Sequence, residues 1–424
     1  MGRRRSFIKG RLLAGLLLAF SILFCACSAP ADSGPSDGML SQQAKPAQSI
    51  KEISGPPEPE RVTLVAVGDN LLHLPVIRWC RTPDGYDFTP LYKNVKASIQ
   101  AADLAFVNQE GPLGGEGFAP SDYPNFNAPQ EAGRDLALTG FTVVNQANNH
   151  GLDQGAEAVL ATADFWDRTE GVTMIGFNRS EQERRQVAVT TARGLRFAWL
   201  AYSYGANGMP MRDAYLMNLI DRKAMAADIA AAKESADAVI VSLHWGDEYQ
   251  FRPSPEQREL AQFLADQGVT LIIGHHPHVI QPVIWVEGRG GNRTLVAYSL
   301  GNFVSSQGDR DAMVEGMLSV VFAKGGSGAV IEDFSILPLV MHYEAGNNNY
   351  CVYPVDIYTE SLARKHSVNQ TGKAVTLDWI NDLTAEIWGD SRILKQGQVG
   401  EDPARPINAR NGNFRIPKQG QQEG

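Results

Sequence analysis

Six of the eight histidines in this 424-residue chain lie in short polar clusters that also hold carboxylate, amide or glycine residues. Imidazole is the commonest side-chain metal ligand, and its ordinary pKa suits acid–base chemistry near neutral pH. Carboxylate and amide oxygens complete the mixed nitrogen and oxygen sites that Zn, Mn or Fe occupy. The six are His73, His150, His244, His275, His276 and His278. Their surroundings therefore favour metal-dependent chemistry.

Each polar cluster begins near the point where a short apolar run ends. Such runs, rich in β-branched residues and closed by glycine or polar residues, predict buried strands. Helix-compatible stretches lie between them at residues 155–167, 221–236 and 254–267, and the last opens on the helix-start signal Ser254-Pro255-Glu256. The predicted strands are residues 62–67, 105–107, 141–144, 238–243, 269–273 and 295–299.

This alternation of strands and helices predicts an α/β fold, with helices packed on the faces of the sheet. A further strand, antiparallel to its neighbours, is predicted within residues 325–343. Ligands of such folds bind beyond the carboxyl ends of the strands, and the polar clusters occupy those positions. The clusters are therefore expected to meet at one site.

Six motifs carry a family resemblance. They are Gly68-Asp69, Asn108-Gln109-Glu110, Asn148-Asn149-His150-Gly151, His244-Trp245-Gly246-Asp247-Glu248-Tyr249, Gly274-His275-His276-Pro277-His278 and Leu300-Gly301-Asn302. In this order, over residues 61–343, the chain resembles the CapA family, which is associated with the synthesis or export of poly-γ-glutamate, an anionic polymer. The resemblance implies a calcineurin-like metallophosphatase sandwich, in which mixed β-sheets are flanked by helices.

The resemblance also implies a centre of two divalent transition metals, which would be Mn, Zn or Fe. Carried over by position, the metal ligands are Asp69, Glu110, Asn149, His244, His276 and His278. His150 takes the place of the catalytic histidine. The chain departs from typical phosphoesterases at two points. It has His73 four residues after Asp69 where they have Asp-x-His, and it has Glu110 where they have a shorter bridging aspartate.

Four more residues are candidate ligands or supports of ligands, namely His73, Asn148, Glu248 and His275. Structural roles remain open for several positions. Asp69 could cap a turn, and one of Asn148 and Asn149 could be a turn residue. His275 stands beside two ligands, a position that suits orienting them as well as it suits ligation. His342 and His366 have no such context and are interpreted as ordinary histidines.

Three functions fit these residues. A two-metal site would favour hydrolysis of a phosphoester or an amide by a metal-activated hydroxide, with His150 as proton donor. The family association favours a role in a poly-γ-glutamate synthesis or export complex. A third alternative is a non-catalytic assembly factor whose metals bind the carboxylates of the polymer. Fold alone does not separate these alternatives.

The N-terminus resembles a bacterial lipoprotein signal peptide, predicted here as residues 1–26. A basic start precedes an apolar run at residues 12–24, which is short for a spanning helix. Cys27 is the expected lipidation site because small Ala26 precedes it, whereas bulky Phe24 precedes Cys25. An ordinary cleaved signal or an uncleaved anchor is the alternative. All of these readings predict an extracytoplasmic protein, and the first predicts a lipoprotein of the bacterial cell membrane.

Composition divides the remaining chain. Residues 27–60 are rich in Ser, Pro and Gly and are predicted to form a flexible tether. Residues 61–345 form the predicted metallophosphatase-like domain, and residues 346–395 a predicted extension packed on it. Residues 396–424 resemble the tether in composition and are predicted to be a disordered tail.

Charge and cysteine content narrow the classes of partner and site. The net charge of −9 leaves no basic surplus for phosphate neutralisation, so no nucleic-acid partner is expected. Two of the four cysteines lie in the leader, and only Cys80 and Cys351 lie in the body. Their isolation argues against a thiolate zinc site and a disulfide-rich scaffold, although one Cys80–Cys351 bridge remains an alternative.

Overall fold

A computed structural model describes residues 61–326 and 328–389 of the chain. The predicted signal peptide, Cys27, the tether and the predicted C-terminal tail lie outside the described residues. Within the described part, no helix has the length and apolarity needed to cross a membrane.

The first of two large sheets is mixed and has the strand order β15-β14-β13-β1-β4-β5-β6. Its strands β1, β4, β5 and β6 run parallel, whereas β13, β14 and β15 form an antiparallel half. The bounds are β1 (Arg61–Leu71), β4 (Leu104–Glu110), β5 (Val143–Asn145), β6 (Thr173–Ile175), β13 (Val314–Gly325), β14 (Gly328–Glu344) and β15 (Asn348–Pro354).

The second sheet is also mixed, with the order β11-β12-β10-β9-β8-β7. Its inner strands β8, β9, β10 and β12 run parallel, and an antiparallel strand closes each edge. The bounds are β7 (Ala188–Ala192), β8 (Leu195–Ser203), β9 (Ala238–His244), β10 (Leu271–His275), β11 (Val283–Glu287) and β12 (Arg293–Ala297).

The two sheets pack face to face through large apolar side chains. Phe106 of β4 stacks on Trp199 of β8 at 5.8 Å, and Phe322 of β13 meets Phe197 of β8 at 5.0 Å between ring centroids. All four rings are buried. This core confirms the predicted α/β sandwich of mixed sheets flanked by helices.

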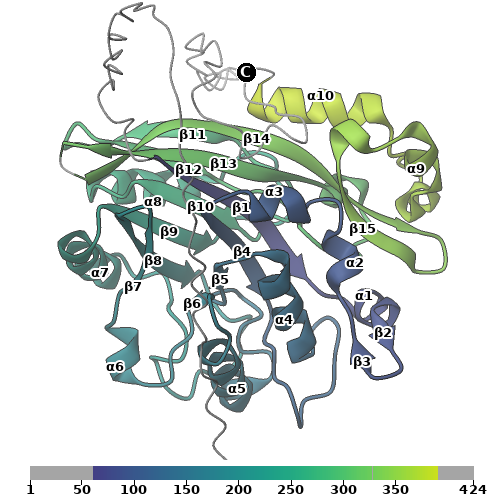
Figure 1. The fold of residues 1–424 in the computed structure, drawn as a ribbon, viewed down its shortest axis with the longest axis horizontal. Helices are drawn as coiled ribbons and strands as arrows, with labels where there is room; N and C mark the ends of the chain where they lie inside the picture. Colours follow the sequence, from purple (N-terminus) through teal and green to yellow (C-terminus); the bar gives the residue numbers. More distant parts are fainter. Residues whose placement is uncertain (1–60, 327, 390–424) are drawn as a thin grey trace, which may run out of the picture. The chain divides into compact units, whose positions relative to one another are not determined.

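Helices cover the outer faces of both sheets, with α7 and α8 beside the second sheet and α4 and α5 beside the first (Figure 1). The three predicted helices are present as α5, α7 and α8, and Ser254 and Gln257 form a capping box at the start of α8. The helix bounds are α1 (Leu74–Trp79), α2 (Thr89–Tyr92), α3 (Lys96–Gln100), α4 (Gln130–Thr139), α5 (Gly155–Asp167), α6 (Glu181–Arg184), α7 (Arg222–Ser235), α8 (Pro255–Asp266), α9 (Glu360–Lys365) and α10 (Leu377–Trp388). A small hairpin of β2 (Arg81–Thr82) and β3 (Gly85–Tyr86) follows α1.

Residues 346–389 continue the same structure, and the rest of the predicted extension, residues 390–395, lies outside the described residues. β15 extends the first sheet by pairing with β14. At the end of α10, the Trp388 indole donates a hydrogen bond to the Gln281 carbonyl oxygen at 3.1 Å. The same ring lies over Gly316 of β13, where a Cβ atom would be only 2.8 Å from it. The last helix is therefore tied to both the sheet and the loop that follows β10.

Cys80 and Cys351 are both buried and are free thiols, so the alternative of a disulfide between them is not realised. Burial raises the pKa of the Cys80 thiol and raises that of Cys351 to about 11. Both groups therefore behave as small apolar side chains at neutral pH.

His342 and His366 form a buried pair between β14 and the segment after α9. His342 Nδ1 lies 2.7 Å from the Tyr358 hydroxyl oxygen, and His366 Nε2 donates to the Met341 carbonyl oxygen at 2.9 Å. Their ring centroids are 5.1 Å apart. Burial, and then the charge of His342, lower the pKa of His366 to about 4, so the ring is neutral at pH 7.

We expect this pair to make the free energy of unfolding depend on pH. The pKa of His366 is lower in the folded chain than the ordinary 6.5, so the folded state binds fewer protons between these values. Stability should be full above about pH 6.5 and fall towards pH 4, by at most about 3 kcal/mol at roughly 1.4 kcal/mol per pKa unit. Urea denaturation at several pH values measures this slope, and His366→Gln should flatten it. An unchanged slope in that variant would contradict the assignment.

Candidate metal centre

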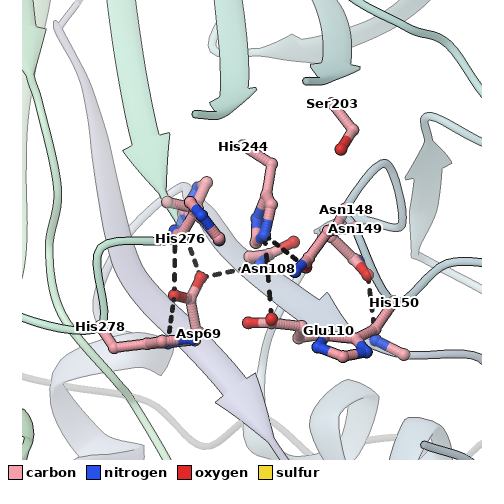
Figure 2. Close-up of polar contacts among 12 residues, drawn as sticks. Asp69, Asn108, Glu110, Asn148, Asn149, His150, Ser203, His244, His276 and His278 are labelled. Carbon is pink, nitrogen blue, oxygen red and sulfur yellow. Dashed lines mark hydrogen bonds and ion pairs between the residues drawn. The ribbon is translucent and has the colours of Figure 1, made fainter. Parts of the chain in front are cut away.

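The predicted ligands lie at the carboxyl ends of parallel strands from both sheets. Asp69 pairs in register with Asn108, two residues before Glu110, across β1 and β4. In the second sheet, His244 at the end of β9 pairs with His275 at the end of β10. Figure 2 shows Asp69, Asn108, Glu110 and His244 converging from the two sheets. Three of the predicted ligands, Asp69, Glu110 and His244, therefore lie at the same edge of the sandwich.

The loop after β10 adds two more histidines, which lie in left-handed backbone. His276 has φ 98° and His278 has φ 58°. This conformation is uncommon for residues other than glycine, and its strain persists only where the surrounding structure enforces it. In this loop the His278 imidazole and the His276 backbone N–H both lie beside Asp69. The chain at Gly301 also crosses next to β1, and a Cβ atom at Gly68 would lie 1.8 Å from the Gly301 carbonyl oxygen.

Asp69 is fully buried and heavily hydrogen-bonded. Its Oδ1 accepts a hydrogen bond from Asn108 Nδ2 at 2.7 Å, and its Oδ2 accepts one from the His276 backbone N–H at 3.2 Å. The Nδ1 atom of His275 lies 3.3 Å from Oδ1, and the Nδ1 atom of His278 lies 3.5 Å from Oδ2. Burial alone would raise the pKa of Asp69, but the interactions with these histidines hold it well below its usual range. Asp69 is therefore ionised.

Glu110 is equally buried, yet neither of its carboxylate oxygens has a hydrogen-bond partner. Its nearest basic group is His244, whose Nε2 lies 3.8 Å from Oε1. Burial, and then the negative charge of Asp69, raise the pKa of Glu110 well above its usual value. A buried carboxylate of this kind is costly unless an opposite charge compensates it.

The histidines of the centre present unused nitrogen atoms. His244 Nδ1 and His276 Nδ1 have no hydrogen-bond partner, and the two rings lie 4.9 Å apart. Burial, and then the neighbouring histidines, lower the pKa of His244 well below its usual value and that of His276 to about 3. Both rings are therefore neutral, which is the form that ligates a metal.

His278 differs from these two rings. Burial disfavours its charged form, but the carboxylates of Glu110 and Asp69 raise its pKa to about 9 in the metal-free chain. Its Nδ1 lies 2.9 Å from Asn302 Oδ1. A proton on His278 thus supplies positive charge beside the carboxylates of Glu110 and Asp69, as a bound cation would.

These residues fit divalent cations. Ligand atoms of Asp69, Glu110 and His278 lie within 4.8 Å of one another, and so do those of Glu248, His276 and His278. His278 belongs to both groups, so the two positions adjoin. Glu248, predicted only as a support or a ligand, stands among the ligands of the second group. Mixed carboxylate and imidazole donors of this kind suit Mn, Zn or Fe.

Asn149 contacts another predicted ligand, because its Oδ1 is 2.8 Å from His244 Nε2. Asn148 has a structural role in the described contacts. Its Nδ2 donates to the Gln109 carbonyl oxygen at 2.9 Å, and its Oδ1 accepts from the Gly111 N–H. Of the two asparagines, Asn149 is thus the one that faces the candidate ligands.

His275 and His73 belong to neither group of ligand atoms. His275 lies against Asp69 and stacks on Phe106 at 5.5 Å between ring centroids. His73 Nδ1 accepts from the Ser306 N–H at 3.3 Å, and its ring meets Phe126 edge-on at 5.2 Å. Burial lowers the pKa of His73 to about 4, so this ring is neutral at pH 7.

His150 lies beside the centre and has a carboxylate partner that was not predicted. Its Nδ1 is 2.7 Å from Asp153 Oδ2, which also accepts the Phe126 N–H at 2.7 Å. The spacing of three residues between His150 and Asp153 is the signal that could have identified the pair. Asn207, on the loop after β8, brings its Nδ2 to 3.4 Å from the same ring nitrogen, and nothing in the sequence indicates this contact.

Comparison with known proteins shows the family to which this chain belongs. The family model described as "Bacterial capsule synthesis protein PGA_cap" matches residues 63–307, a range that contains all the candidate ligands and His150. The PGA biosynthesis protein CapA of Bacillus subtilis is 26% identical over 294 residues, covering 68% of this chain and 73% of the relative. The capsule biosynthesis protein CapA of Bacillus anthracis is 28% identical over 264 residues, covering 59% and 61%.

A more distant relative is the probable polyglutamine synthesis accessory protein Rv0574c of Mycobacterium tuberculosis, 29% identical over 204 residues, or 45% of this chain and 53% of the relative. Solved structures with weaker likeness include the NAD nucleotidase of Haemophilus influenzae, with TM-score 0.42 and 11% identity over 77% of this chain and 67% of that one. The calcineurin-like phosphoesterase YfkN of Bacillus subtilis gives TM-score 0.40 and 11% identity over 76% and 99%.

We expect protein purified without chelators to carry about two transition-metal ions per chain, the number of a two-metal site. The double variant Asp69→Ala, His276→Ala should lose them, because it removes one donor from each group of ligand atoms. Elemental mass spectrometry measures the content. Asp382→Ala, an exposed carboxylate of α10, is the matched control and should keep the metals. A wild-type protein that folds without metal, and binds none on dialysis against Mn, Zn or Fe, would contradict the assignment.

Proposed function

Because the chain belongs to the bacterial capsule synthesis protein family PGA_cap, we propose that it acts in the synthesis or export of a poly-γ-glutamate capsule. We propose also that its centre carries out a metal-dependent hydrolytic step on a phosphoester or an amide of the cell envelope. One observation carries the second part. Buried carboxylate and imidazole atoms without partners converge beside a histidine that is hydrogen-bonded to a carboxylate.

The residues divide into two groups in this proposal. Asp69 and Glu110 would hold one cation and His276 the other, with His278 between the two positions; Glu248 lies at the rim, where its exposed carboxylate stays available to a ligand. When bound, the cations supply Lewis-acid polarisation of the scissile group and lower the pKa of a nucleophilic water. His244 and Asn149 would complete the donor set. His244 Nε2 lies 3.8 Å from Glu110 Oε1 and 2.8 Å from Asn149 Oδ1.

His150 would serve as the proton donor. Its Nδ1 is engaged by Asp153, which fixes the ring orientation. The Nε2 atom is then the one that can hold a proton for the leaving group. Asn207 would steady the same ring, because its Nδ2 lies 3.4 to 3.5 Å from both nitrogen atoms. His150 is only 5% exposed, which limits the water that competes for this proton.

The proposed setting is the outer face of the bacterial cell membrane. Lipidation at Cys27 would hold the protein there, and residues 28–60 would span the distance between the membrane and the first strand. A membrane-bound complex for polyglutamate synthesis or export is the proposed partner. The proposal rests on the leader sequence and on the names of the relatives.

The proposed lipid anchor predicts a difference between two neighbouring cysteines. Cys27→Ser should move the full-length protein out of the membrane fraction and abolish incorporation of radiolabelled palmitate in its bacterial host. Cys25→Ser is the matched control and should leave both unchanged, because Cys25 would be removed with the signal peptide. Equal labelling of wild type and Cys27→Ser would exclude Cys27 as the acylated residue.

The hydrolytic proposal predicts that His150→Ala lowers kcat by a factor of about 10²–10⁴, the usual contribution of a general acid. Asp153→Asn should cause a smaller loss, because the ring keeps its place but loses its charged partner. The assay is hydrolysis of bis(p-nitrophenyl) phosphate and of a γ-glutamyl p-nitroanilide by metal-loaded protein. Unchanged metal content in both variants is the control. Full activity of His150→Ala would remove His150 from the mechanism.

A further inference from the structure

A cavity of about 300 Å³ opens directly beside the metal centre. This volume is at the lower end of the range for small-molecule sites, roughly 300–1,000 Å³. His150 and His278 belong to its wall, so a ligand in the cavity lies next to the proposed reaction site. The wall adds Glu248 and three aromatic rings, those of Tyr123, Phe126 and Tyr249.

Two of these rings are exposed to solvent. Tyr123 is 75% exposed and Tyr249 is 45% exposed. Single exposed aromatic residues are common, but these two flank one cavity, with centroids 6.5 Å from His150 and 6.0 Å from His278. Their position argues for contact with a ligand.

The backbone of Tyr249 supports the same conclusion. Its φ is 60°, a left-handed conformation that is unfavourable for a bulky residue. The Tyr249 N–H donates to the Pro277 carbonyl oxygen at 2.8 Å, which ties this strained residue to the histidine loop. Gln307 Nε2 donates to the Tyr249 hydroxyl oxygen at 3.3 Å. The strained turn places the ring over the cavity, at a cost that core packing does not explain.

Apart from the candidate ligand His278, the charged groups around the cavity are acidic. None of the residues that line it is lysine or arginine, whereas Glu248 is part of its wall. Two more carboxylates lie near the cavity. The charge of Asp122 acts on His73, and that of Asp309 acts on Tyr249. Burial, and then the charge of Glu248, raise the pKa of Tyr249 to about 12, so its phenol is neutral. A polyanion would find no lysine or arginine here, and only the candidate ligand His278 and bound metal could offset its charge.

A cation is favoured by the same features. Ammonium groups bind over the faces of Tyr and Phe rings, with a gain of about 0.5–2 kcal/mol that grows as the site is desolvated. The carboxylate of Glu248 adds charge complementarity. In a γ-linked glutamate chain, every internal unit offers an amide and a free carboxylate. Only the amino-terminal unit offers an ammonium group, and it lies next to a carboxylate that the metals would attract.

We propose that this cavity binds the terminal ammonium group of a γ-glutamyl chain, so that the centre works at the amino-terminal end of the polymer and not along its length. The assignment rests on the proposed function for the identity of the polymer. Tyr123, Phe126 and Tyr249 contact the ammonium group, and Glu248 balances its charge. The adjoining carboxylate and amide face His150 and the metal ligands.

The test compares two ligands that differ only at that nitrogen, γ-linked triglutamate and its N-acetylated form. Isothermal titration calorimetry with metal-loaded wild-type protein should give at least tenfold tighter binding of the free amine, and mass spectrometry should check that both ligands stay intact. Tyr123→Ala and Tyr249→Ala should bring the ratio of affinities close to one. Tyr123→Phe and Tyr249→Phe should preserve it, because the ring face remains.

Tyr204→Ala is the matched control. Tyr204 is 48% exposed and its ring lies 4.7 Å from His276, but it does not line the cavity. This variant should keep the wild-type ratio. A lost ratio in Tyr204→Ala would show that any change near the centre has the same effect, and would overturn the assignment to the cavity.

The remaining outcomes separate the inference from the proposed function. Equal affinity of both oligomers for the wild type would overturn the inference while leaving polyglutamate binding intact. Failure of both to bind would overturn the inference and count against the proposed polymer, whereas hydrolysis of phosphoesters would still support the metal centre. Saturable binding of glucose 1-phosphate in that case would assign the aromatic rings to a carbohydrate.

Discussion

Two carboxylates buried at the ends of adjacent strands impose the main constraint on this structure. Asp69 and Glu110 lie side by side with almost no solvent exposure, and moving such charges out of water costs several kcal/mol each unless it is compensated. Asp69 is compensated by hydrogen bonds from Asn108 and the His276 backbone, and by the imidazoles of His275 and His278, whose Nδ1 atoms lie 3.3 and 3.5 Å from its carboxylate oxygens. Glu110 is not, since both of its oxygens lack partners. A divalent cation held near Asp69, Glu110 and His278 would supply the missing positive charge.

The arrangement of strands in the two sheets places these two carboxylates next to each other and next to the histidines. Parallel strands end at the same edge of each sheet, so β1 and β4 deliver carboxylates to the edge where β9 and β10 deliver histidines. The two edges meet because aromatic rings lock the sheets face to face. Gly68 lets the segment at Gly301 approach closely, and that segment carries Asn302 to His278. The costly backbone at His276 and His278 accompanies two contacts with buried Asp69, made by the His276 backbone N–H and the His278 imidazole.

The sequence predicts the fold class and the meeting of the ligands, because both follow from local pattern. An apolar run that ends in Gly68-Asp69 or in His244-Trp245 predicts a buried strand and its site residue together. Among the strands that were not predicted are β8 and β13, which no histidine or carboxylate directly follows to mark a site. The pairing of Asp153 with His150 was marked by their spacing of three residues and was missed. The approach of Asn207 and the ring of Tyr249 depend on contacts between loops that are distant in sequence or on backbone strain. No periodicity encodes such contacts, so they become visible only in three dimensions.

Charge is segregated across the site, and this bears on how an anionic polymer could use it. Two divalent cations would more than neutralise Asp69 and Glu110, making the inner centre attractive to phosphate or carboxylate oxygens. The rim has the opposite character, with Glu248, Asp122 and Asp309 near exposed tyrosines and no lysine or arginine lining the cavity. A chain of uniform negative charge would be attracted to the metal centre and repelled by the acidic rim. A ligand with an ammonium group next to its carboxylate gains at both, so the electrostatics of the site favour the one unit of a γ-glutamyl chain that carries both charges.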